Sequence, residues 1–142
     1  MEYIKAKKVK MGQIFKDEKV IPVTFVKVLE TSDKVAVTVG DKLKVSGTMK
    51  GRGFQGTVKR HGFSGGPKTH GQKNRHRAPG SIGATTPQRV VPGRKMSGHM
   101  GCTRVTIKNL ELVGMNETEG LLFIKGAVPG FNGGFLEIRK AV

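Results

Sequence analysis

The chain has 142 residues, which suggests one domain, and its 26 Lys and Arg against 10 Asp and Glu give a formal net charge of +16. Only 36% of the residues are apolar and 21 are Gly, so the core must be small. No apolar run approaches the roughly 20 residues of a membrane span, the first 15 residues lack a signal core, and the single Cys102 excludes an internal disulfide framework. These features predict a cytoplasmic protein.

Segments rich in β-branched or alternating apolar residues predict strands along most of both flanks of the chain. The alternation slips near Asn109, which predicts a bulge or bend there, and residues 116–120 predict a turn. No helical period lasts three turns. The fold class we expect is mainly β, with a small antiparallel β-barrel made of residues 1–46 and 102–142. The expected strands cover residues 20–29, 35–39, 42–47, 104–115, 121–128 and 134–142.

Residues 47–101, which we call the extension, interrupt this barrel between two strands. They hold 13 of the 21 Gly and 4 of the 6 Pro, with almost no periodic apolar pattern. A structureless segment of this length is either disordered or ordered by a partner. The extension is not repetitive, as disordered linkers usually are, and apolar residues such as Phe54 and Ile82 stand at irregular places. This pattern favours a chain fitted to an irregular surface.

The charge is concentrated in the middle of the chain. No acidic residue stands between Asp41 and Glu111, whereas residues 42–110 carry 15 Lys and Arg and all four His. A long field of one sign predicts a polyanion partner. Nucleic acid is favoured over an anionic membrane, because so many glycines prevent an amphipathic helix. Glycines allow close backbone approach and cations neutralise phosphates. The candidate RNA-binding residues are Lys50, Arg52, Lys59, Arg60, His61, Lys68, His70, Lys73, Arg75, His76, Arg77, Arg89, Arg94, Lys95, His99, Met100 and Arg104.

Three other chemistries are disfavoured. Residues 51–56, GRGFQG, match a dinucleotide fingerprint, which needs a following helix and an acidic residue about twenty positions on; the next residues, TVKRHGFSGGP, predict no helix, and KNRHR stands at the second place. One Cys with His99 three residues before it lacks the spacing of a zinc site. The acid-free extension offers no carboxylate for acid–base catalysis. We therefore expect no catalytic residue, no metal and no cofactor.

Long stretches of the chain resemble a known family. The segments KGRGFQGTVKRHGF (50–63), HRAPGSIGATTPQRVVPGRKMSGHMGCTRVTIKNLELV (76–113) and LLFIKGAVPG (121–130) closely resemble the large-subunit ribosomal protein of the third universal family, ribosomal protein L-three of the bacterial type. KKVKMGQIF near the N-terminus is similar to the family's KKVGMTxxF, with Lys10 where Gly is usual and Gly12 where Thr is usual. The path from Glu30 to Lys42 is short for the family, so the chain resembles a shortened member.

The resemblance implies a translation-type β-barrel and an extension that runs through rRNA toward the peptidyl transferase centre. It implies that residues 92–101, PGRKMSGHMG, lie at the tip of that extension. Many bacterial members have a methylated Gln at the position of His99, and His99 cannot carry that modification. The implied role is structural, in ribosome assembly and translation, with large-subunit rRNA and proteins of families fourteen and nineteen as partners. The alternative function is that of a free RNA-binding protein or RNA chaperone.

Overall fold

The computed structural model describes residues 3–31 and 37–141. The chain divides into two compact units, of which the first is residues 1–50 with 102–142 and the second is residues 51–101.

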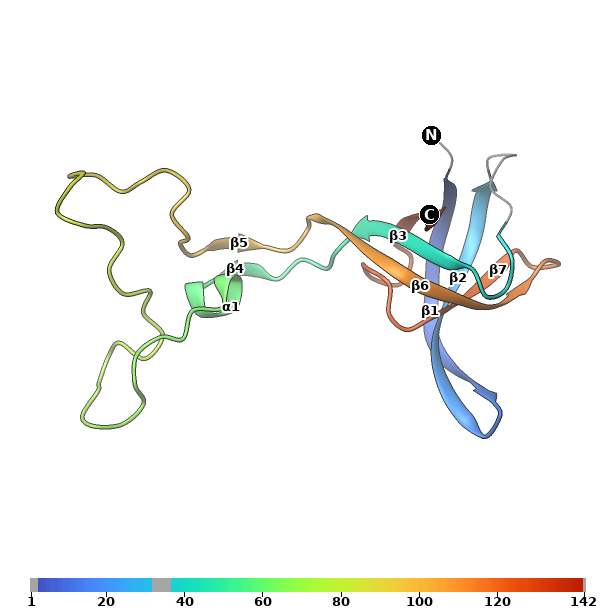
Figure 1. Cartoon of the computed structure of the whole chain (residues 1–142), viewed down its shortest axis with the longest axis horizontal. Helices are drawn as coiled ribbons and strands as arrows, with labels where there is room; N and C mark the ends of the chain where they lie inside the picture. The colour runs from blue at the N-terminus through green and yellow to red at the C-terminus, as the bar shows by residue number, and fades with distance from the viewer. Residues whose placement is uncertain (1–2, 32–36, 142) are drawn as a thin grey trace. The chain divides into compact units, whose positions relative to one another are not determined.

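Six antiparallel strands of the first unit close into a barrel, in the order β1-β2-β7-β6-β3-β8 (Figure 1). The closing pair joins Ile4 of β1 to Ile138 of β8. The predicted mainly β class and the antiparallel barrel are therefore confirmed. The strands are β1 (Ile4–Lys16), β2 (Lys19–Thr31), β3 (Lys42–Thr48), β6 (Arg104–Asn116), β7 (Leu121–Lys125) and β8 (Phe135–Lys140).

The barrel core follows from the period-two alternation of its strands. Leu43, Val45, Leu112, Ile124 and Ile138 come from four strands and are all fully buried in one apolar cluster. Burying a side chain of this size contributes about 1.5–3 kcal/mol. The first unit therefore has an apolar core of its own.

Most of the strand predictions are confirmed, including the irregularity near Asn109. Along the β3–β6 ladder, Leu43 pairs with Leu110 and Val45 pairs with Ile107, so β6 has one more residue than β3 between these pairs. Asn109 has a φ of 60°, a left-handed conformation that Asn tolerates better than most residues. The predicted strand at 121–128 is shorter than expected and ends at Lys125.

The predicted strand at 35–39 is wrong over residues 37–39, which form no strand, while residues 35 and 36 lie outside the described residues. The Thr38 backbone N–H donates to the Asp41 carboxylate over 2.9 Å, and the Thr38 hydroxyl donates to the same oxygen over 3.1 Å. Local side-chain hydrogen bonds of this kind compete with a strand ladder.

The strand β1 was missed because its buried face includes a lysine. Ile4 and Ala6 are buried, and Lys8, the next residue in phase, is only 5% exposed. Its ammonium donates to the carbonyls of Val128 and Gly130, each over 3.0 Å. A buried ammonium is tolerated when it is hydrogen-bonded in this way, so the strand alternates although its sequence does not.

The second unit contains three short elements, β4 (Gly53–Gln55), α1 (Thr57–His61) and β5 (Gly98–Met100). The expectation that no helix follows GRGFQG is wrong. The helix has five residues and ends at Gly62, which has a φ of 74° and donates its N–H to the Val58 carbonyl. Glycine adopts this left-handed end conformation without strain.

Candidate nucleic-acid interface

A two-stranded ribbon brings the two ends of the second unit together. In this ribbon β4 pairs with β5, and Phe54 lies opposite His99. The Arg52 backbone N–H donates to the Met100 carbonyl over 2.9 Å. Phe54 is 74% exposed and His99 is also exposed, so the ribbon presents an aromatic ring and an imidazole to the surroundings. Rings of this kind stack on unpaired RNA bases.

The last turn of α1 is basic and fixes the chain that approaches β5. Arg60 Nη1 donates to the Met96 carbonyl over 2.6 Å, and His61 Nε2 donates to the same oxygen over 2.9 Å. A Cβ on Gly98 would lie 2.9 Å from Arg60 Nη1, so a glycine leaves room for this guanidinium. Lys59 of the same turn is exposed. One short helix thus holds Arg60 and His61 against backbone and presents Lys59 outward.

A second cationic segment, residues 65–78, is closed by backbone contacts. The Gly66 N–H donates to the His76 carbonyl over 3.0 Å, and His76 Nδ1 donates to the Pro67 carbonyl over 3.0 Å. Gly65 has a φ of +76°, and a Cβ there would lie 2.1 Å from the His76 carbonyl oxygen. The tight turn therefore requires glycine at this position.

Residues 79–97 are exposed without exception. Four large apolar side chains stand among them, namely Ile82, Val90, Val91 and Met96, and their exposed fractions run from 37% to 56%. One side-chain contact crosses the segment, from Arg94 Nη2 to the Ser81 carbonyl over 2.5 Å. This segment has too little apolar burial to offset the entropy lost when its backbone is ordered.

The predicted RNA-binding residues fall into four groups. Lys50 and Arg104 lie in the first unit and the others in the second. Four make the backbone contacts just described, and Met100 is a half-buried residue of β5. The rest have no side-chain hydrogen bond or ion pair with another described residue, and they are Arg52, Lys59, Lys68, His70, Lys73, Arg75, Arg77, Arg89, Lys95 and His99. With no carboxylate in this part of the sequence, their charge is uncompensated.

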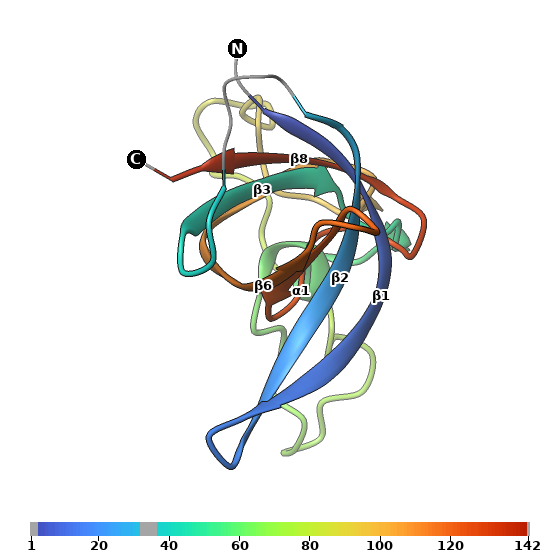
Figure 2. The same cartoon turned by 90° about the vertical axis from the view of Figure 1, so that its right-hand side faces the viewer.

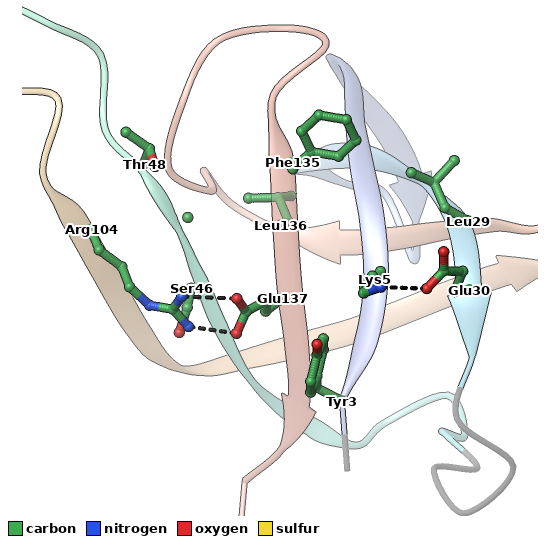
Figure 3. A pocket seen from close by; sticks show the side chains of 11 residues that line it. Tyr3, Lys5, Leu29, Glu30, Ser46, Thr48, Arg104, Phe135, Leu136 and Glu137 are labelled. Carbon is green, nitrogen blue, oxygen red and sulfur yellow. Dashed lines mark hydrogen bonds and ion pairs between the residues drawn. The ribbon is translucent and has the colours of Figure 1, made fainter. Parts of the chain in front are cut away.

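In the barrel, by contrast, several cations form ion pairs with carboxylates. Arg104 donates to both carboxylate oxygens of Glu137, over 2.8 and 2.5 Å, and Lys5 donates to Glu30 over 2.6 Å (Figure 3). These two pairs line a pocket of about 450 Å³ on the barrel, together with apolar residues that include Phe135. The Arg104 guanidinium lowers the pKa of Glu137 below its usual value. Arg104 is therefore already neutralised by a carboxylate.

Lys8 is a buried cation of the barrel that was not among the predicted RNA-binding residues. Burial lowers the pKa of its ammonium, and repulsion from Lys50 lowers it further. Lys8 and Lys50 both belong to the first unit. The available signal was the spacing of Lys8 from Ile4 and Ala6, which places a lysine in phase with buried residues.

No group of three or more His, Cys, Asp and Glu lies close enough to hold a metal ion in residues 3–31 and 37–141. Over the same residues, no helix has the length and apolar character needed to cross a membrane.

A family model described as Ribosomal protein L3 matches residues 5–122. The chain belongs to the ribosomal protein L3 family. Curated relatives named Large ribosomal subunit protein uL3 include one from Desulforapulum autotrophicum, 63% identical over 105 residues, or 73% of this chain and 50% of the relative. Another from Teredinibacter turnerae is 56% identical over 108 residues, or 75% and 50%. A third from Deinococcus radiodurans is 52% identical over 103 residues, or 72% and 49%.

This L3-family chain spans about half the length of the curated relatives it matches. The matched residues 5–122 include the whole second unit together with β2, β3, β6 and all of β1 except Ile4. The family resemblance drawn from the sequence is confirmed.

Proposed function

We propose that this chain is a structural constituent of the large ribosomal subunit, which binds large-subunit rRNA through residues 47–101 and performs no catalysis. The observation that supports this proposal most strongly is that the extension has many basic side chains and no acidic ones. Ten predicted contact residues have no side-chain hydrogen bond or ion pair with another described residue, and no carboxylate is present in the segment to neutralise them. Phosphates are the partners that such a set of cations fits.

The two groups of side chains in the extension have different roles. Arg60, His61, His76 and Arg94 fix the backbone by donating to carbonyls, whereas side chains such as Lys59 and Arg77 remain available to phosphates. Exposed rings at Phe54 and His99 would stack on unpaired bases. Within this proposal, residues 92–101 lie nearest the peptidyl transferase centre and residues 47–101 fill a gap between rRNA helices.

The barrel is the anchor in this account. It folds on its own core and would sit at the rRNA surface, in contact with neighbouring large-subunit proteins, among them those of families fourteen and nineteen. Arg104 contributes least to rRNA binding, because Glu137 already neutralises it. Located in this way, the chain works in the cytoplasm as part of the ribosome and supports subunit assembly.

Sedimentation of a cell lysate tests the proposal. A stoichiometric component of the large subunit stays with that particle through moderate salt, whereas a free RNA-binding protein or RNA chaperone dissociates from it. Recovery of the chain at the top of the gradient, away from the large subunit, would contradict the proposed function.

A further inference from the structure

The loop between β7 and β8 is held against β1 by one buried lysine. The Lys8 backbone N–H donates to the Gly134 carbonyl over 2.9 Å, and the Lys8 carbonyl accepts from the Gly133 N–H over 2.7 Å. The Lys8 ammonium donates to the Val128 and Gly130 carbonyls, each over 3.0 Å. Figure 2 shows this loop, in orange and red, passing beside β1. Four hydrogen bonds made by one residue thus fix the course of the loop.

The loop presents an exposed phenylalanine beside a lysine of β1. Phe131 is 60% exposed. A Cβ on Gly133 would lie 3.8 Å from Lys7 Cε and 4.0 Å from Phe131 Cε2, so these two side chains flank the same point. Phe135, at the start of β8, is 73% exposed and pairs directly with Lys7. Because directly paired residues have their side chains on one face of a sheet, Lys7 is a neighbour of both rings.

The lysines beside these rings have no partner of opposite charge. Lys7 of β1 pairs directly with Lys27 of β2. Both are exposed, and neither has a side-chain hydrogen bond or ion pair with another described residue. Like charges directly opposite each other destabilise a sheet, and an anion between the two ammonium groups would remove this repulsion. The carboxylates on the same outer face are already paired, Glu30 with Lys5 and Glu137 with Arg104.

Phe135 also lines a hollow on the outside of the barrel. It belongs to the pocket of about 450 Å³, with Leu29 of β2 on the other side of β1 (Figure 3). A volume of this size is within the range of pockets that hold small ligands. Aromatic rings that stand among exposed cations are typical of surfaces on which unpaired bases stack while the cations bind the phosphates.

We propose that the barrel has its own site for unpaired nucleotides of the large-subunit rRNA. Bases stack on Phe131 and Phe135, and the phosphate that links them lies between Lys7 and Lys27. Two rings on either side of a like-charged pair match the alternation of base and phosphate along a single strand. A net charge of +16 disfavours a second copy of this chain as the occupant. The inference rests on the proposed function, which supplies the rRNA, and adds a barrel site to the contacts of the extension.

Binding of the full chain to protein-free large-subunit rRNA tests the stacking. Phe131→Leu with Phe135→Leu keeps two apolar side chains but removes the rings, and should weaken binding at least about fivefold. Phe131→Tyr with Phe135→Tyr keeps the rings and should bind like the unaltered chain. The matched control is Phe15→Leu, at a ring that is also 73% exposed and whose next four residues, KDEK, have no net charge. Equal binding of the Leu and Tyr variants, or an equal loss in the control, would overturn the inference.

The salt dependence of the same binding tests the phosphate. Lys7→Ser with Lys27→Ser should reduce the slope of log K against log salt by about 0.7, the value for one phosphate of a single strand. The control is Lys16→Ser with Lys19→Ser, because these lysines are also directly paired but enclose two carboxylates, and it should leave the slope unchanged. No change at the first pair, or the same change at both, would contradict the proposed site.

Photo-crosslinking identifies the occupant within the particle. Azidophenylalanine replaces Phe131 in the full chain, and large subunits that contain the variant are purified and irradiated. The expected product is an adduct with a nucleotide of the rRNA. An adduct with a large-subunit protein, or no adduct, would overturn the inference while the proposed function stands, because the chain is present in the subunit. Absence of the chain from large subunits would overturn both.

Discussion

The barrel and the second unit are built on opposite principles, although they belong to one chain. The barrel buries residues such as Leu43 and Ile138 completely and pairs Arg104, Lys5, Lys125 and Lys140 with carboxylates. The second unit has no carboxylate, and among its residues, all of which the structure describes, only Thr57 and Gly101 are buried. The first unit neutralises some of its cations with its own carboxylates, whereas the second contains no carboxylate that could do so.

The largest effect should come from the same substitution made once in each unit. Ile138→Ala removes a fully buried side chain and should lower the barrel's free energy of unfolding by about 2–5 kcal/mol. Ile82→Ala, at a side chain that is 43% exposed, should leave that free energy unchanged. Denaturant titration of the isolated chain measures both, and similar losses at the two positions would remove the distinction between the units.

Charge reversal at Arg94 should come next. Arg94→Glu loses the hydrogen bond to the Ser81 carbonyl and places a carboxylate among phosphates. We expect rRNA binding to weaken by about 2 kcal/mol, or roughly thirtyfold, with impaired assembly or altered sensitivity to peptidyl-transferase inhibitors. Barrel stability should not change. Subunits that assemble at the normal rate with normal inhibitor sensitivity would contradict the placement of Arg94.

A smaller effect should separate an unpaired cation from a paired one. Lys59→Ala should reduce the slope of log K against log salt by about one phosphate contact, about 0.7 to 0.9 units. Arg104→Ala should change the slope less, because Glu137 already neutralises that guanidinium. Filter binding to an rRNA fragment over a range of salt measures both slopes. Equal changes in slope would mean that the ion pair opens on RNA.

The smallest effect concerns pH. Because the pKa of Glu137 in the folded barrel is lower than the ordinary 4.5, its stabilising contribution is complete above about pH 4.5 and is lost as pH falls through the lowered value. Glu137→Gln should therefore unfold with a flatter pH dependence below pH 4.5. The pair is partly exposed, so the difference should be small and should shrink in high salt. An unchanged acid titration would show that the ion pair adds no stability.

Sequence periodicity was sufficient for the strands whose buried residues are apolar, and it even located the bulge at Asn109. It failed where a polar side chain is buried in a strand or forms local hydrogen bonds that replace a strand. The buried Lys8 concealed β1, and the Thr38–Asp41 hydrogen bonds replaced an expected strand. Lys8 is bonded to carbonyls that are distant in the sequence, and Thr38 is bonded to a carboxylate three residues away. The alternation of apolar residues contains no information about either hydrogen bond.

Charge distribution singled out the extension as a candidate site, but the sequence could not divide its cations by role. Arg60 and Lys59 are neighbours with the same formal charge. Only the structure shows that the first donates to the Met96 carbonyl while the second is exposed. The short helix that contains both residues was missed because its five residues are too few for a periodic signal.

Hydrogen exchange of the full chain, alone and bound to large-subunit rRNA, tests the contrast between the units most directly. The account predicts strong protection of β3, β6 and β8 in both states. Residues 79–97 should exchange at the rate of an unstructured chain when the protein is alone and become protected on rRNA. Protection of residues 79–97 without RNA, or no gain of protection on binding, would contradict the claim that RNA shapes the extension.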